Sequence, residues 1–178
     1  MSNENDFLPK DYEPPKGESR YFKFQSGTNK FRILSNPIIG WEDWENKKPL
    51  RFKMNEKPES PVDPSRPIKH FWAMIVWDFG SECIKILEIT QVTIMQSITA
   101  LSRDIEWGSP FNYNIKVEKQ GEKLDTKYTV LASPPSELTD EIKEAYKNVP
   151  INLDALYDGE DPFDTSLPNP ELDDDLPF

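Results

Sequence analysis

The chain has 178 residues and a formal net charge of −11, and this length fits one domain with added segments. The single cysteine, Cys83, excludes an internal disulfide framework, and with the single histidine, His70, it cannot form a Cys/His zinc cage. No apolar stretch is long enough to span a membrane, and residues 1–10 lack the apolar run of a secretory signal. We therefore expect no membrane contact, no metal and no other cofactor.

Charge is distributed unevenly along the chain. Residues 151–178 contain nine acidic side chains and no Lys, Arg or His, whereas residues 20–69 hold eleven bases against six acids. Blocks of like charge usually act as tails outside the fold. The sequence therefore predicts a mobile arm over residues 1–19, a folded domain over residues 20–150 and a disordered acidic tail over residues 151–178.

The first half of the domain has the alternation of short strands. A hairpin turns at Gly27, and further strands are predicted at 38–44 and 50–54. Four prolines within residues 55–67 predict a loop between strands. The strongest strand pattern covers residues 70–79, and both of its faces are largely apolar. One face is expected to pack on the core, and the other on a ligand or a covering element.

The spacing of apolar residues then changes from strand-like to helical and returns to strand-like. After a strand at 83–89, helical spacing predicts a helix over residues 91–104, followed by strands at 112–118 and 125–132 and a short helix at 136–147. This order predicts a mostly β protein. It is the connectivity of a five-stranded OB barrel, with one helix between the third and fourth strands and an oligonucleotide-binding face on strands 2 and 3. A β-sandwich or another small barrel is the alternative.

Basic and aromatic side chains alternate in the first half of the domain. Single-strand binders need cations for phosphates and rings that stack on bases, so we expect these groups to line one trough. Phe31, Phe52, Trp77 and Tyr113 lie on apolar strand faces and are expected in the core instead. The candidate DNA-binding residues are Lys23, Lys30, Arg32, Trp41, Trp44, Lys47, Lys48, Arg51, Lys53, Lys69, Trp72, Lys116 and Lys127.

The last six residues join negative charge to an apolar end. This tip resembles the acidic C-terminal tip of bacterial single-stranded DNA-binding proteins, and the blocks Gly27–Leu34, Ile39–Trp44 and Gly121–Tyr128 resemble a family of phage single-stranded DNA-binding proteins. The resemblance implies an OB-fold, sequence-tolerant binding of single strands and docking of other proteins on the tip. The docking residues it implies are Asp173, Asp174, Asp175, Leu176, Pro177 and Phe178.

The same resemblance implies the protein's setting. It places the chain in the host cytoplasm during phage DNA replication, recombination or repair, with a polymerase, helicase, primase or nuclease as partner. Some related phage proteins carry a zinc-binding insert, which this chain lacks. An enzyme is not expected, since no Gly-rich phosphate loop is present and only His70 is available for a nucleophile pair. The alternative hypothesis is an acidic adaptor or DNA mimic that binds no strand itself.

Overall fold

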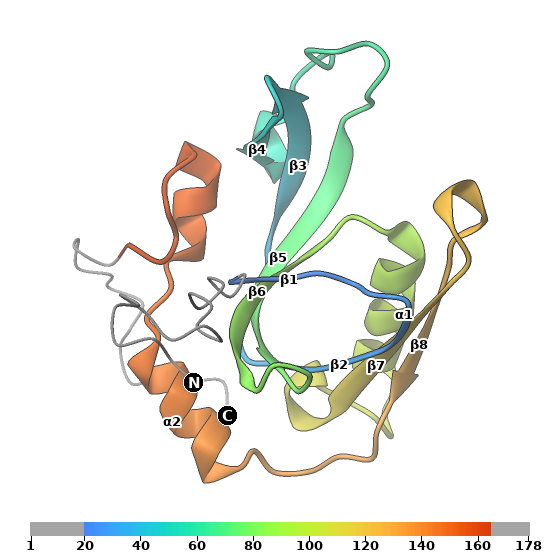
Figure 1. The fold of residues 1–178 in the computed structure, drawn as a ribbon, viewed down its shortest axis with the longest axis vertical. Coiled ribbons are helices and arrows are strands. Elements are labelled where there is room, and N and C mark those ends of the chain that lie inside the picture. The colour runs from blue at the N-terminus through green and yellow to red at the C-terminus, as the bar shows by residue number, and fades with distance from the viewer. Residues whose placement is uncertain (1–19, 165–178) are drawn as a thin grey trace, which may run out of the picture.

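A computed structural model of the protein describes residues 20–164 (Figure 1). The predicted arm over residues 1–19 and the C-terminal tip lie outside these residues. In the described part, eight strands form one mixed sheet, with two α-helices and four short 3₁₀ turns around it. The elements are β1 Tyr21–Phe22, β2 Gly27–Ile33, β3 Ile38–Glu45, β4 Lys48–Lys53, η1 Met54–Glu56, β5 Lys69–Asp78, β6 Cys83–Ile89, α1 Val92–Arg103, η2 Pro110–Asn112, β7 Asn114–Gln120, η3 Lys123–Asp125, β8 Lys127–Ala132, α2 Asp140–Asn148 and η4 Leu153–Asp158.

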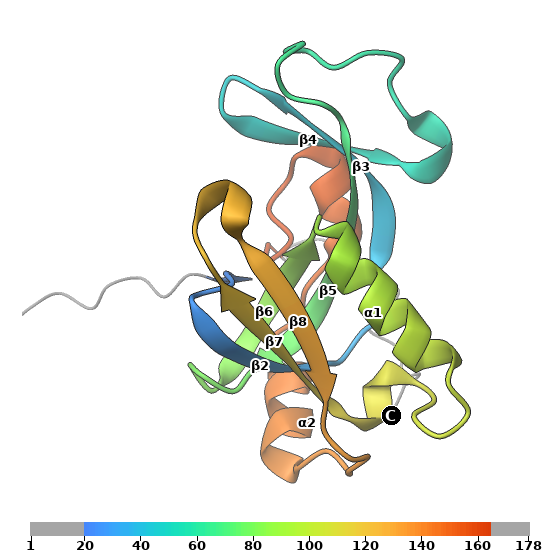
Figure 2. The same cartoon turned by 90° about the vertical axis from the view of Figure 1, so that its right-hand side faces the viewer.

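The curved body of the molecule is built around β2. This strand pairs antiparallel with β5 and β7, and the outer neighbours give the order β6-β5-β2-β7-β8, with β1 running parallel beside β6. The prediction of a mostly β protein with one helix before the last hairpin is confirmed. A closed five-stranded barrel is not: among residues 20–164, β8 pairs with β7 alone and the sheet stays open (Figure 2).

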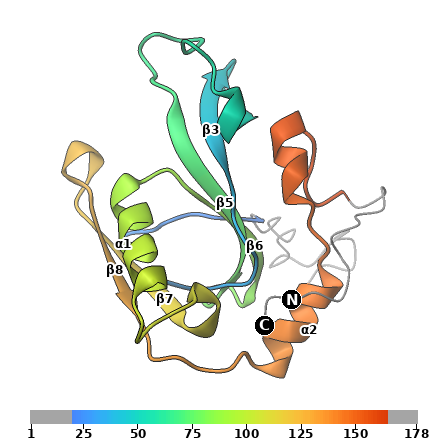
Figure 3. The same ribbon diagram turned by 180° about the vertical axis from the view of Figure 1, so that it is seen from behind.

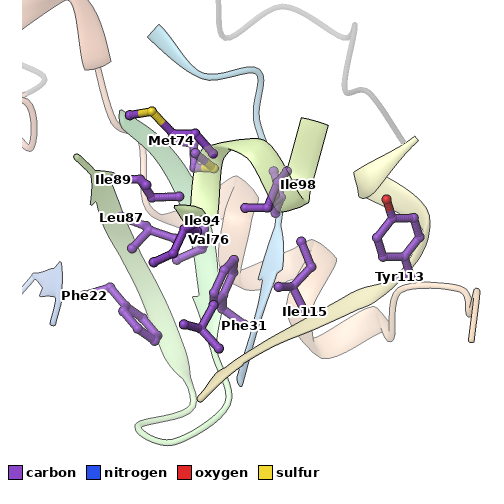
Figure 4. Packing of buried hydrophobic residues seen from close by; sticks show 13 residues of the cluster. Phe22, Phe31, Met74, Val76, Leu87, Ile89, Ile94, Ile98, Tyr113 and Ile115 are labelled. Atoms are coloured by element: carbon purple, nitrogen blue, oxygen red, sulfur yellow. The ribbon is translucent and has the colours of Figure 1, made fainter. Parts of the chain in front are cut away.

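The main core lies inside this curve, under α1. Alternation places Phe31 of β2 and Val76 of β5 on the inner side, where they meet Ile94 and Ile98 of the helix (Figure 4). All four side chains are buried, and Tyr113 joins them. Burial of these aromatic and branched side chains holds the helix against the sheet, at about 1.5–3 kcal/mol for each fully buried side chain.

A second core covers the outer face of β5 and β6. Phe71 and Trp77 of β5 pack there against Ile142 of α2 and against Ile151 and Leu156, around η4. Figure 3 shows α2 on the side of β6 that faces away from α1. The second apolar face of the strongest predicted strand is therefore occupied by a covering element. The predicted boundary of the acidic tail at residue 151 is wrong for residues 151–164, because their apolar side chains are needed to close this face.

The third part of the structure is an arm that rises from the curved body. It consists of β3, β4, the loop 54–68 and the first residues of β5 (Figure 1). Asn46 and Lys47 both have positive φ, 51° and 64°, which is the backbone of a tight two-residue hairpin turn. The strands predicted at 38–44 and 50–54 are confirmed as this hairpin, inserted between β2 and β5.

Candidate nucleic-acid interface

The pairing register of the arm gathers aromatic side chains on one face. Trp41 of β3 lies directly opposite Phe52 of β4 and His70 of β5, and Ile39 lies opposite Trp72. Directly paired residues project to the same side of a sheet, so these five side chains share a surface. We call it the aromatic face. It is continuous with the inner side of β5, which leads to α1.

Trp41 is held in a fixed orientation on this face. Its indole Nε1 donates a hydrogen bond to the carbonyl oxygen of Met54 at 3.1 Å. Its ring lies 5.2 Å from the ring of His70, and the ammonium of Lys57 lies 4.2 Å from its centre. The ammonium of Lys57 thus lies over one face of this partly exposed indole, whose edge is fixed, and it places positive charge where a base would stack.

His70 and Trp72 also form one wall of a pocket. Nδ1 of His70 lies 2.7 Å from the carbonyl oxygen of Gly40, and because a carbonyl only accepts, Nδ1 carries the proton and Nε2 is left for another partner. The pocket has a volume of about 390 Å³ and its other wall is α1. Its lining residues are His70, Trp72, Met95, Gln96, Thr99, Ala100 and Arg103. An apolar floor with a few polar groups at the edge suits a nucleobase.

The opposite face of the arm carries a different kind of site. Arg51 donates two hydrogen bonds to Glu88 of β6, and its Nε lies 3.6 Å from Oε2 of Glu42. Glu42 is almost fully buried; burial, and then the neighbouring Glu88, raise its pKa to about 8, although Arg51 acts in the other direction. The guanidinium of Arg51 is thus committed to internal carboxyl groups and is not free for a phosphate.

The remaining predicted residues of the arm lie on that opposite face or at the hairpin tip. Trp44 shares the face with Glu42 and lies under the guanidinium of Arg66, 4.8 Å from its ring centre. Lys53 lies 5.8 Å from the ring centre of Tyr157 in η4. The other three are exposed: Lys69 at the edge, and Lys47 and Lys48 at the tip.

Arg32 is a structural residue. It is only 2% exposed, because the segment from η2 to Ser136 covers it. Its guanidinium donates to the carbonyl oxygens of Phe111 at 2.9 Å and Ser136 at 2.6 Å, and to Oδ1 of Asn114 at 3.1 Å. These bonds tie β2 to the chain on both sides of the last hairpin. The prediction that Arg32 contacts DNA is therefore wrong.

The other predicted lysines belong to the curved body. Lys30 of β2 lies directly opposite Lys116 of β7, on the outer side of the sheet. Lys127 begins β8, and Lys23 lies in the connection from β1 to β2. The expectation that all candidate residues line one trough is wrong, because strand alternation divides them between two faces of the arm and the wall of the body.

What the structure does bring together is a smaller set. Trp41 and Trp72 share the aromatic face, and His70, Lys57 and Arg103 join them. The sequence pattern predicts no DNA contact for these three, since Lys57 lies in a proline-rich loop and Arg103 at the end of a helix. The signal available for His70 was its place in a strand two residues before Trp72, which puts both on one face.

In residues 20–164 no group of three or more His, Cys, Asp or Glu side chains is arranged to hold a metal ion. No helix in this part of the chain has the length and apolar character needed to cross a membrane.

The chain is similar to one curated phage protein. It is 24% identical over 139 residues to a protein of Escherichia phage T5 with the name "Probable ssDNA-binding protein". The match covers 62% of this chain and 53% of the phage protein, so the chain spans about half the length of that relative. No protein-family model and no solved structure matches the chain. The resemblance to phage single-stranded DNA-binding proteins is thereby confirmed, at the level of a distant similarity.

Proposed function

We propose that the protein binds single-stranded DNA without sequence preference and that the aromatic face is where the bases stack. The observation that carries this proposal is the placement of Trp41, His70 and Trp72 on one accessible face beside an apolar pocket, with Lys57 and Arg103 at its edges. The similarity to a phage protein named for single-stranded DNA binding supports it.

In this arrangement, base stacking and phosphate neutralisation belong to different side chains. The flat rings of Trp41 and Trp72 stack on bases, which contributes about 1–3 kcal/mol per base for any sequence. Lys57 and Arg103 neutralise phosphates and release counterions, so affinity falls as salt rises, with a slope of about −0.7 per neutralised phosphate on single strands. The pocket against α1 receives one base, with His70 Nε2 and Gln96 available as hydrogen-bonding partners.

The strand order invites a comparison with oligonucleotide-binding barrels. The strand order β6-β5-β2-β7-β8, with a helix between β6 and β7, resembles that of an OB barrel in which β6 and β8 are not paired. An OB barrel binds oligonucleotides on its strand 2–3 face. Here the outer face of the corresponding β5 and β6 is covered by α2 and η4, so the proposed strand path moves to the aromatic face of the arm.

The C-terminal tip is assigned a separate role. We infer that Asp173 to Phe178 recruit a replication or recombination protein, since aspartates steer the tip to a basic surface and Phe178 fills an apolar pocket there. Deletion of these six residues should leave strand affinity equal or higher and abolish capture of the partner. A collapse of strand binding in the deletion variant would contradict this role.

The direct test uses the full chain and a fluorescently labelled oligothymidylate. Anisotropy should rise on binding at low salt, tryptophan emission should be quenched, and added salt should reverse both. Duplex DNA and RNA of the same length are the comparison ligands. Absence of any binding at low salt would refute the proposal and favour the acidic adaptor or DNA mimic, for which the chain's net charge of −11 is the argument.

A further inference from the structure

A second pocket lies at the far end of β5 from the aromatic face. It opens between the β1–β2 connection and the β5–β6 turn, and its volume is about 390 Å³. The walls come from β1, β2, the β5–β6 turn and β6. Its lining residues are Tyr21, Phe22, Lys23, Gln25, Ser26, Thr28, Asn29, Lys30, Asp78, Gly80, Ser81 and Lys85. We call it the lysine pocket.

Both loops at the rim of the lysine pocket are fixed by side-chain hydrogen bonds. Asn29 accepts a bond from the backbone N–H of Gln25 at 2.8 Å and donates to the carbonyl oxygens of Gln25 and Val117, which locks the β1–β2 connection onto β7. Asp78 accepts from the N–H of Gly80 and the hydroxyl of Ser81, each at 2.8 Å, which shapes the β5–β6 turn. The pocket is thus preorganised, and a ligand would not have to order it.

The charges of the pocket do not cancel. Oδ2 of Asp78 forms an ion pair with Nζ of Lys85 at a distance of 2.9 Å. Burial acts to raise the pKa of Asp78, but the hydrogen bonds from Lys85, Ser81 and Gly80 outweigh it and hold that pKa below its ordinary value. Asp78 is therefore ionised and neutralises Lys85. No ion pair within residues 20–164 joins Lys23 or Lys30 to a carboxylate, so two positive charges remain.

Lys30 is positioned rather than loosely solvated. Its ammonium lies 4.4 Å from the ring centre of Phe79, and its β2 position is directly opposite Lys116 of β7. Two like charges opposite each other destabilise a sheet, and an anion between them would relieve the repulsion. Glu118, directly opposite Thr28 on the same side of β7, offsets the charge of Lys116, so the net charge of the pocket comes from Lys23 and Lys30.

We propose that the lysine pocket binds a phosphomonoester, and specifically the terminal phosphate of a nucleic acid strand. A monoester carries a charge of about −1.5 to −2 at pH 7, which matches the two unpaired lysines. A backbone diester carries only one negative charge, and the strand on both sides of it would need a path into and out of the pocket. Hydroxyl groups of Ser26 and Thr28 and the walls on several sides suit an end more than a strand passing through. This inference rests on the proposed function and adds the strand end as a ligand.

The test compares three forms of one labelled oligothymidylate: phosphorylated at the 5′ end, phosphorylated at the 3′ end and bearing only hydroxyl ends. The full chain should bind one phosphorylated form about tenfold more tightly than the hydroxyl form at low salt, as charge-assisted hydrogen bonds provide. The preference should shrink below about pH 6, where the monoester loses its second charge.

Variants locate the effect. The double variant Lys23→Ala/Lys30→Ala should remove the preference for the phosphorylated end and leave binding of the hydroxyl form nearly unchanged. The matched control is Lys143→Ala/Lys147→Ala, which removes two exposed lysines from α2 and should keep the preference. Equal binding of all three forms, or a preference that survives in the double variant, would overturn the inference.

Two further results distinguish a strand end from free phosphate as the ligand, and this inference from the proposed function. Inorganic phosphate should not abolish the preference at concentrations equal to those of the oligonucleotide; if it does, the pocket is a free-phosphate site and the strand-end assignment fails. Failure of the hydroxyl form to bind at all would instead count against the proposed function, because stacking on the aromatic face requires no terminal phosphate.

Discussion

The two faces of β5 look alike in sequence and differ completely in the structure. On one face, Phe71 and Trp77 are buried under α2 and the residues around η4, and Trp77 is 4% exposed. On the other, Val76 is buried under α1, but His70 and Trp72 at the start of the strand remain partly exposed above the helix. The same residue type therefore builds core on one face and leaves a binding surface on the other. What decides is which element covers it.

The largest expected effect is on the covered face. Trp77→Ala should lower the free energy of unfolding by about 3–5 kcal/mol, because it removes a large buried side chain and leaves a cavity between β5 and α2. Urea denaturation followed by circular dichroism measures it. Trp44→Ala, which removes a partly exposed tryptophan from the arm, is the control and should cost clearly less. Equal losses in the two variants would contradict the assignment of Trp77 to the core.

The second-largest effect is expected at Glu42, which lies on the face of the arm opposite the aromatic face. The pKa of Glu42 rises from 4.5 to about 8 on folding, because burial and then Glu88 favour its protonated form. A raised folded-state pKa stabilises the protein fully below pH 4.5, and this contribution is lost as pH rises through about 8. Relative to Glu42→Gln, the native chain should therefore lose stability between pH 5 and 9, by at most a few kcal/mol, on the order of 1.4 kcal/mol per pKa unit.

Urea midpoints of both proteins across this pH range provide the measurement. The exposed Glu137→Gln is the matched control and should follow the native chain. Parallel curves for the native chain and Glu42→Gln would show that Glu42 is not held protonated.

A third experiment sharpens the comparison on the binding side. Trp72→Ala should weaken oligothymidylate binding by about 1–3 kcal/mol, because a base loses its stacking partner. Trp44→Ala is the matched control, since Trp44 lies on the same arm but on the opposite face, and it should bind almost as the native chain does. Anisotropy titrations at one fixed salt concentration compare them. The aromatic face would lose its role if both variants weakened binding equally.

The smallest effect belongs to the cations beside the aromatic face. Lys57→Ala and Arg103→Ala should each reduce the salt slope of binding by about 0.7, because each removes one phosphate contact. Arg66→Ala, which removes the cation over Trp44 on the opposite face, should leave the slope unchanged. Titrations over a series of salt concentrations give the slopes. A change in the Arg66 variant alone would move the strand path to the other face.

Much of the fold could be predicted because strand and helix periods are local. The alternation in residues 70–79 and the helical spacing of Ile94, Ile98 and Leu101 lead directly to β5 and α1. Whether the sheet closes could not be predicted from local periods, because closure depends on whether β8 pairs with a strand that is distant in sequence. The packing of Ile151 and Leu156 was also missed, because the acidic residues around them dominate the composition of that segment.

The sequence by itself determined that the chain is mostly β, that it places cations among aromatic rings in its first half and that its C-terminal end is acidic. Those properties follow from local composition and period. Only the tertiary structure decided which of these groups are available. It buried Arg32 among distant carbonyl oxygens, committed Arg51 to Glu88 and left Trp41 and Trp72 on a shared face. Burial and pairing depend on neighbours far along the chain, and a strand pattern carries no information on what will cover it.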